Sequence, residues 1–186
     1  MEEVLEMFVN ERRIPSVREM RLHKREVRDP EIIREILEEC SVVRLGTRDE
    51  EGMFIVPVNF GYEFYEKESG HGLTLFIHGA GEGRKADAFD SCPDVAVEMD
   101  CRHGLITGDY TCSYSYSYRS IMGNGKVRRA ADEQEKVYGL TKIMEHMAPG
   151  AEIEFSPSML ERTEVFFIEM EKFTAKERKA KQKADK

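Results

Sequence analysis

The sequence predicts a mainly β domain with flanking helices, folded as a small antiparallel barrel and not as a doubly wound parallel sheet. Five to seven segments carry the alternating or continuous apolar pattern of strands, and turns that contain Gly, Pro or charged residues separate them. Two or three segments with apolar residues at helical spacing lie between these strands. So many strands with so few helices favour a barrel.

A first helix is expected to begin after Asp29, because an N-cap carboxylate followed by Pro30 is typical of a helix start. Its apolar residues recur at helical spacing and define one buried face: Ile32, Ile33, Ile36 and Leu37. Residues 41–47 then have a strand pattern, residues 48–52 the composition of a hairpin turn, and residues 53–62 the pattern of a second strand that contains a proline.

The middle of the chain continues with short elements. A polar loop over residues 66–72 leads to a third strand at residues 73–78. A short helix is expected at residues 85–91, where Pro93 then prevents its continuation, and a fourth strand at residues 95–101.

Residues 109–122 and 125–129 supply one or two further strands. Over residues 110–118 the side chains alternate strictly, with one aromatic face made by Tyr110, Cys112, Tyr114, Tyr116 and Tyr118. This face is expected to pack on the core or on a neighbouring subunit; the alternative is that its far end reaches a ligand. A helix at residues 132–147 and a last strand at residues 163–173 complete the domain.

The clearest local chemistry follows the third strand. His78, Gly79 and Ala80 form a turn, a Gly-x-Gly step comes next, and two adjacent cations, Arg84 and Lys85, open the short helix. Glycines let backbone N–H groups approach an anion, and the cations supply charge for a phosphate. The spacing matches neither a Walker loop nor Gly-x-Gly-x-x-Gly. The alternative is a plain strand-to-helix connection whose cations face solvent.

Composition narrows the class of partner. At 186 residues the chain is long enough for one well-buried domain and too short for two. The net charge of −8 argues against general nucleic-acid binding, and no apolar run approaches the length of a membrane span. We therefore expect a protein that binds neither nucleic acid nor membrane.

Cysteine usage indicates a reducing compartment. The four cysteines, at positions 40, 92, 101 and 112, form no Cys-x-x-Cys pair, and the start of the chain has no signal-peptide pattern. Reduced thiols in the cytoplasm are the simplest interpretation. Cys101, His103 and Cys112 match no standard zinc spacing, so no metal site is expected.

Two terminal segments lie outside the expected domain of residues 20–172. Residues 1–19 have the pattern of an extension with one apolar helical face, made by Leu5, Phe8 and Val9. Residues 173–186 form a basic tail with few apolar residues. It is expected to be a solvated, frayed helix end; a polyanion-binding arm is the alternative.

Taken together, residues 20–172 resemble the flavin-binding split-barrel superfamily that includes pyridoxamine 5′-phosphate oxidase. Within it they look most like the nitroimidazole-resistance (Nim-type) proteins. The ordered set of segments carries the resemblance: Arg25-Glu-Val-Arg-Asp29-Pro30, Val43-Arg44-Leu45-Gly46-Thr47, Val56-Pro57-Val58-Asn59-Phe60-Gly61-Tyr62, Phe76-Ile77-His78-Gly79-Ala80, Gly83-Arg84-Lys85, Cys92-Pro93-Asp94-Val95 and Tyr118-Arg119-Ser120-Ile121-Met122-Gly123-Asn124-Gly125. The fold implied is a split antiparallel β-barrel of the FMN-binding type.

The resemblance implies FMN bound at the interface of a homodimer, with its phosphate held after the third strand. By position, the cofactor-binding residues are Arg44, Leu45, Gly46, Thr47, Pro57, Val58, Asn59, Phe60, Ile77, His78, Gly79, Ala80, Gly83, Arg84, Lys85, Tyr118, Arg119 and Ser120. Arg84 and Lys85 match the phosphate contact, and Arg44 and Thr47 a second set of phosphate or ribityl contacts. The last three residues match a strand that reaches across from the partner subunit.

The segment from Pro57 to Phe60 matches the part of the family that lies along the flavin ring, and His78 matches a residue at the reacting edge. His78 is therefore the expected catalytic residue. Structural alternatives stay open for three of these residues. The Asn59 side chain could hydrogen-bond the backbone of a bulge next to Pro57, and Arg44 could pair with a surface carboxylate. His78 could be a buried structural histidine.

The implied function is an FMN-dependent oxidoreductase that reduces a small organic acceptor such as a nitroaromatic. The chain lacks the C-terminal motif by which pyridoxamine phosphate oxidases recognise their vitamin substrate, so that substrate is not expected. FAD presents a phosphate at the same place and stays open. The alternatives are a non-catalytic flavin- or haem-binding module, with His78 or His103 as axial ligand, and a nucleic-acid-binding regulator that uses the basic tail.

Overall fold

One antiparallel sheet dominates the computed structural model, which describes residues 20–68 and 70–179. Its strands run in the order β3-β2-β6-β7-β8-β5-β4, with β1 added beside β8. Their bounds are β1 (Glu26–Val27), β2 (Val43–Asp49), β3 (Gly52–Val58), β4 (Gly61–Lys67), β5 (Gly70–Gly79), β6 (Asp94–Ile106), β7 (Ser115–Arg129) and β8 (Glu164–Arg178).

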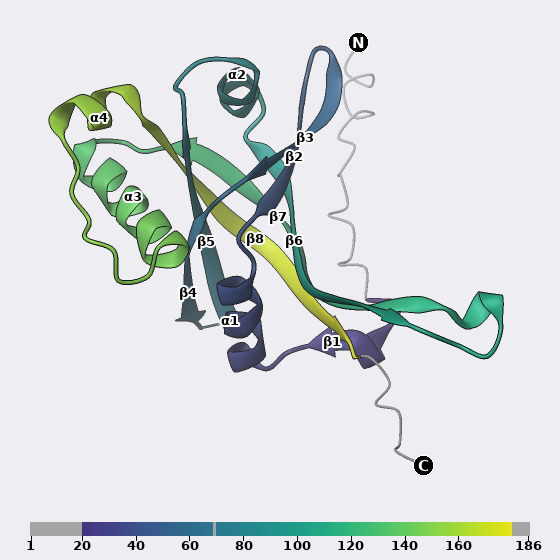
Figure 1. Ribbon diagram of the computed structural model, residues 1–186. Coiled ribbons are helices and arrows are strands. Elements are labelled where there is room, and N and C mark those ends of the chain that lie inside the picture. Colours follow the sequence, from purple (N-terminus) through teal and green to yellow (C-terminus); the bar gives the residue numbers. More distant parts are fainter. Residues whose placement is uncertain (1–19, 69, 180–186) are drawn as a thin grey trace, which may run out of the picture.

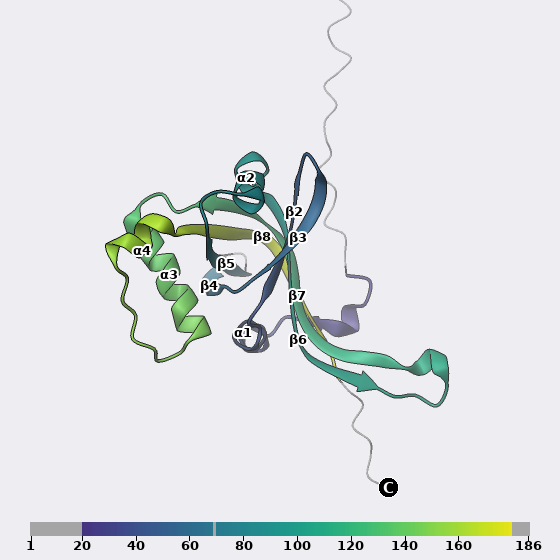
Figure 2. The same ribbon diagram turned by 45° about the horizontal axis from the view of Figure 1, so that its top comes forward.

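Four α-helices surround the sheet: α1 (Pro30–Glu39), α2 (Arg84–Ser91), α3 (Glu133–Met147) and α4 (Pro157–Arg162). Two short 3₁₀ turns, His23–Arg25 and Thr111–Ser113, complete the described elements. Figures 1 and 2 show α2 over one end of the barrel and α1 near the other end, while α3 and α4 lie together on one side. Among the described residues no helix is long and apolar enough to span a membrane.

The barrel is split, as predicted, because β3 and β4 follow each other in sequence yet stand at opposite ends of the strand order. The chain between them turns away at Asn59 and Phe60. At Gly61 a Cβ atom would collide with the backbone of α3 at Lys142, so glycine lets the helix pack directly on the turn. The predicted single strand over residues 53–62 is wrong, because β3 pairs with β2 as far as Val58 whereas the chain from Gly61 onward pairs with β5.

The core has two parts. The main cluster fills the barrel and joins α1 and α2 to the inner face of the sheet, with Ile36, Leu45, Phe60, Leu75 and Phe166 completely buried. A smaller cluster lies between α3, α4 and the other face of β5 and β8, where the rings of Phe76 and Phe167 meet edge to face. Burial of this apolar area is the main stabilising contribution.

Sequence patterns over a few adjacent residues predicted the positions of several helices correctly. Asp29 caps α1, since its carboxylate accepts a hydrogen bond of 3.0 Å from the Glu31 amide. The expected helices at residues 85–91 and 132–147 correspond to α2 and α3. The short helix α4 was not expected.

Three predictions about strands need correction. The polar loop expected at residues 66–72 is a tight hairpin, because β4 and β5 pair as far as Lys67 and Gly70. Residues 110–118 are not one strand, since a 3₁₀ turn interrupts them before β7 begins at Ser115. They form the end of an arm, made by the β6–β7 hairpin, that projects from the barrel in both views (Figures 1 and 2).

The last strand runs past residue 173, because β8 pairs with β7 as far as Arg178. The first residues of the expected basic tail are therefore strand, and the expected frayed helix is wrong there. The expected extension over residues 1–19 and the tail beyond residue 179 lie outside the described residues.

Candidate functional site

The glycine turn joins β5 to α2 and leaves the start of that helix open. Gly83 occupies the N-cap position with φ of 95°, a conformation that favours glycine, and no described side chain caps the helix. The first backbone N–H groups of α2 are therefore unsatisfied at the point where Arg84 and Lys85 begin the helix. Free amides next to cations are the arrangement that binds an anion.

Lys85 is the strongest feature of this turn. Its side chain is half-buried, with Nζ 5.8 Å from the centre of the Phe166 ring. A Cβ atom at Gly79 would lie 2.5 Å from Nζ, so the glycine makes room for the ammonium group. Burial lowers the pKa of Lys85, and no carboxylate in the described part of the chain pairs with it. A bound anion would supply the missing countercharge.

Arg84 is held differently. It is exposed, and its Nε and Nη2 atoms donate hydrogen bonds of 2.6 and 3.1 Å to the Asp49 carboxylate at the end of β2. Its guanidinium group also stacks 4.2 Å from the centre of the Phe54 ring on β3. The same bonds lower the pKa of Asp49. Arg84 thus fixes α2 to the β2–β3 hairpin, and an anion would share it with Asp49.

Thr47 lies on the same face of β2 as Asp49, two residues earlier. Its side chain is only 3% exposed, and its hydroxyl has no hydrogen-bond partner among the described residues. A buried hydroxyl without a partner is uncommon, because leaving it unsatisfied costs about 1–3 kcal/mol. It is a second polar group that no described residue satisfies.

His78 is the penultimate residue of β5, shortly before α2. It is exposed, and both partial desolvation and the neighbouring Lys85 ammonium lower the pKa of its imidazole. At neutral pH the ring is therefore uncharged, with one N–H donor and one acceptor nitrogen. The structure brings His78, Gly79 and Lys85 together as the sequence suggested.

The turn between β3 and β4 lies beside the end of β5. The β4–β5 pairing begins where Gly61 meets Phe76, two residues before His78 on β5. Asn59 is exposed, whereas Phe60 is fully buried. The Phe60 carbonyl accepts a 2.6 Å hydrogen bond from His146 Nδ1 on α3, which fixes this turn. No local sequence pattern marks His146 for this role, because its partner is distant in the chain.

The remaining residues expected on the first strand divide between two faces. Leu45 and Thr47 point into the barrel, whereas Arg44 and Gly46 point outward. Arg44 pairs with Glu98 at 3.0 Å and Asp100 at 2.8 Å, which is the structural alternative left open for it. The side chains of Arg44 and Thr47 therefore do not meet.

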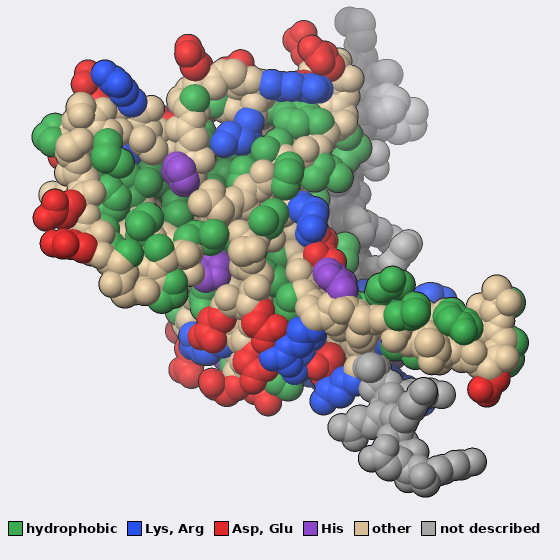
Figure 3. All heavy atoms as spheres, viewed as in Figure 1, with side chains coloured by type: hydrophobic (Ala, Val, Ile, Leu, Met, Phe, Trp, Pro, Cys, Tyr) green, Lys and Arg blue, Asp and Glu red, His purple; other side chains and the backbone are tan. Residues whose placement is uncertain are grey.

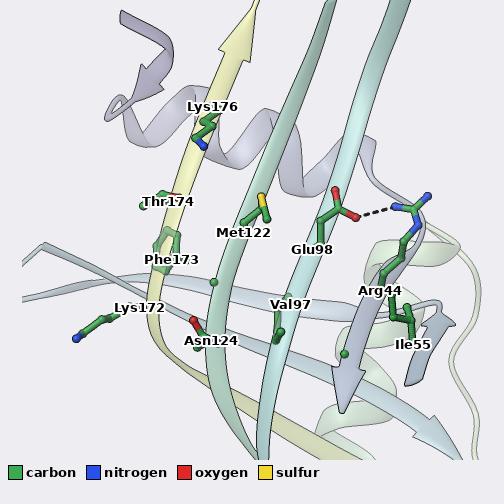
Figure 4. A pocket seen from close by; sticks show the side chains of 13 residues that line it. Arg44, Ile55, Val97, Glu98, Met122, Asn124, Lys172, Phe173, Thr174 and Lys176 are labelled. Atoms are coloured by element: carbon green, nitrogen blue, oxygen red, sulfur yellow. Dashed lines mark hydrogen bonds and ion pairs between the residues drawn. The ribbon is translucent and has the colours of Figure 1, made fainter. Parts of the chain in front are cut away.

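Arg44 borders a hollow of about 610 Å³ on the outer face of the sheet, shown in Figure 4. Strands β3, β2, β6, β7 and β8 form its floor, and apolar side chains such as Ile55, Met122 and Phe173 dominate its lining. The glycine turn contributes nothing to it. This hollow is an open sheet face, and we place the candidate site at the turn, where the half-buried Lys85 stands at the uncapped start of α2.

The structure does not bring Tyr118, Arg119 and Ser120 to the turn of their own chain. Arg119 is buried at the base of the arm, where it pairs with Glu35 on α1 and Glu177 on β8, both at 2.5 Å. In the described part of the chain no group of three or more His, Cys, Asp or Glu side chains is arranged to hold a metal ion.

The fold and this site define a split-barrel protein with an uncapped helix start beside a half-buried lysine. The chain belongs to the Pyridoxamine 5′-phosphate oxidase family, whose model matches residues 29–177. No match was found among curated proteins.

Solved structures support the same assignment. The chain is 28% identical to a candidate 5-nitroimidazole antibiotic resistance protein from Bacteroides thetaiotaomicron, with a TM-score of 0.67 over 81% of this chain and 85% of the other. The predicted resemblance to Nim-type proteins is thereby confirmed.

Two further structures share the fold at lower identity. The flavocytochrome Anf3 from Azotobacter vinelandii is 20% identical, with a TM-score of 0.71 over 90% of this chain and 76% of the other. The FAD and heme binding protein from Mycobacterium smegmatis is 17% identical, with a TM-score of 0.70 over 87% and 76%.

Proposed function

We propose that this protein is a flavin-dependent oxidoreductase of the Nim type, with FMN as its cofactor. One observation carries the proposal: the half-buried Lys85 ammonium has no countercharge in the described chain and stands at the uncapped start of α2. A flavin phosphate would provide that charge and accept the free amides. The family and the names of the flavin-binding neighbours support this identity for the anion.

The residues present fit a flavin. Gly83, Arg84 and Lys85 would hold the phosphate, and the segment from Val58 to Phe60 would lie along the ring beside His78. The half-buried side chains of β3 offer an apolar surface at the open edge of the sheet. When bound, the flavin supplies the electron transfer.

Side chains of the protein itself would orient the reactants and donate hydrogen bonds to the acceptor. His78 is uncharged at neutral pH, so its N–H can hydrogen-bond a nitro or carbonyl oxygen of an acceptor. His146 holds the Phe60 carbonyl and thereby the adjacent turn. We propose a small organic acceptor such as a nitroaromatic as substrate.

We further propose a homodimer with the cofactor at its interface, located in the cytoplasm, where the four free cysteines stay reduced. Large apolar side chains on the outer sheet face are exposed, with Met53 at 85%, Ile55 at 68% and Met122 at 50%. Figure 3 shows that hydrophobic side chains also line the projecting arm, which carries the exposed Leu105 and Tyr116. A second copy of the chain would bury this surface.

The deciding experiment is to denature the purified protein by heat and record the absorbance spectrum and mass of the released molecule. FMN in the supernatant is the expected result. Absence of any flavin, together with no binding of added FMN, would show that the proposal is wrong.

A bound flavin that is bleached by NADH or dithionite and restored by a nitro compound indicates the enzyme. Bleaching without restoration by any acceptor indicates the alternative, a module that binds flavin without turnover. A Soret band in place of the flavin spectrum indicates haem.

A further inference from the structure

Arg129, at the end of β7, links the glycine turn to the far end of α2. Its Nη2 atom donates a 2.9 Å hydrogen bond to the carbonyl oxygen of Gly81, inside the turn. The same guanidinium binds both carboxylate oxygens of Asp90, in the last turn of α2, at 2.9 and 2.7 Å. Its Nη1 atom binds Glu164 at 3.2 Å. One side chain therefore holds the segments before and after the start of α2.

The charge of Arg129 is already neutralised within the chain. The hydrogen bond and charge of Asp90, and then those of Glu164, raise the pKa of the Arg129 guanidinium. With two carboxylates bound, Arg129 is a poor candidate for direct contact with a phosphate. Its planar group, with donors in fixed directions, suits it instead to fixing the position of other groups.

We propose that Arg129 is a positioning residue for anion binding: it holds the glycine turn and α2 in the arrangement that receives the flavin phosphate. The inference rests on the proposed function for its ligand. Gly81 and Gly83 give the turn many accessible conformations, and ordering them costs entropy when the anion binds. Because Arg129 holds the turn through groups of the chain itself, that cost is met during folding and the site is preorganised.

The neighbouring residue offers a matched control. Adjacent side chains on a strand point to opposite faces, so Arg128 meets α3 whereas Arg129 meets α2. Arg128 also binds two carboxylates, Glu135 at 2.7 Å and Glu169 at 3.1 Å, and lies 4.2 Å from the centre of the Phe167 ring. Arg129 lies 5.2 Å from the ring of Phe166. The two arginines differ chiefly in that only Arg129 touches the turn.

The test compares Arg129→Met with Arg128→Met, since methionine keeps most of the hydrocarbon and removes the donors. FMN is titrated into each apo-protein by flavin fluorescence, and backbone hydrogen exchange is followed for residues 79–88 without ligand. Loss of Arg129 is expected to weaken FMN binding by about tenfold, the effect of losing roughly one charge-assisted contact, and to accelerate exchange in the turn. Arg128→Met should stay within about twofold of wild type in both measurements. Equal behaviour of the two variants would overturn the inference.

A second variant covers the case in which Arg129→Met does not fold. Asp90→Asn removes an exposed carboxylate that binds Arg129. Charge attraction alone predicts tighter FMN binding when a negative group near the site is removed. Positioning through Arg129 predicts weaker binding and faster exchange in the turn, so tighter binding would count against it. If the wild-type protein binds no FMN, the proposed function fails, and exchange in the turn alone decides whether Arg129 holds it.

Discussion

Replacing Lys85 by methionine should have opposite effects on folding and on ligand binding. In the ligand-free protein the ammonium group is half-buried beside Phe166 and Gly79 without a countercharge in the described chain. Methionine has similar length, no charge and no need of a partner. The substitution therefore removes an unfavourable charge from the apo-protein and the main attraction for an anion from the site.

The two magnitudes follow from the contacts. Relieving a partly desolvated cation should raise the free energy of unfolding of the apo-protein by about 1 kcal/mol, at the low end of the cost of an unsatisfied group because the side chain keeps some contact with water. Losing a charge-assisted contact with a phosphate should weaken FMN binding by about 1–3 kcal/mol, roughly 5- to 150-fold in Kd. A residue that destabilises the fold and strengthens binding has a functional role.

The pH dependence adds an independent check. Burial lowers the pKa of Lys85, so the unfolded chain holds this proton more tightly than the folded protein does. Stability of the wild-type apo-protein therefore increases as pH rises from the lowered folded-state pKa toward the usual value of 10.5. The advantage of Lys85→Met should shrink over the same interval.

The assay is urea unfolding of both apo-proteins at several pH values, followed by FMN titration at pH 7. Lys126→Met is the control, because Lys126 is exposed and only loosely paired with Glu171 at 3.9 Å. An apo-protein destabilised by Lys85→Met, or an unchanged Kd for FMN, would refute the reasoning.

Three further predictions concern neighbouring groups. Lys85→Met should raise the pKa of His78 toward 6.5, because the ammonium group is one cause of its lowered value. NMR titration measures this pKa, and an unchanged value would show that the two side chains do not interact. Asp49→Asn should free Arg84 and tighten FMN binding by about threefold, a modest effect because the pair is exposed; weaker binding would show that Asp49 positions Arg84 instead. Ile55→Asp should shift the proposed dimer to monomer in sedimentation experiments, and a sedimentation coefficient equal to that of the wild type would exclude this face as the interface.

Short-range signals predicted the parts of this fold that depend on adjacent residues. Asp29 followed by Pro30 marked the start of α1, and the glycines before Arg84 marked the start of α2. The proposed anion site at the turn could be predicted from the sequence for the same reason, because its glycines and cations lie within one short segment. The resemblance had grouped Arg44 with Thr47, whereas the structure places their side chains on opposite faces of β2.

Long-range contacts decided what the sequence pattern could not. The break between β3 and β4 arises because β3 pairs with β2 whereas β4 pairs with β5, so the two strands lie at opposite ends of the strand order. Arg119 matched a ligand-binding position, yet the fold brings Glu35 and Glu177 to it from two other elements. Carboxylates brought close by the fold therefore decide whether an arginine is available to bind a ligand.

By itself, the sequence determined the class of fold, the family and the segment with the chemistry for an anion, because each depends on local periodicity or on the order of motifs. Only the tertiary structure decided that Lys85 lacks a countercharge in the described chain while Arg84, Arg44 and Arg119 have theirs. The physical reason is that ion pairing and desolvation depend on the distance in space between side chains, which residue spacing along the chain does not specify.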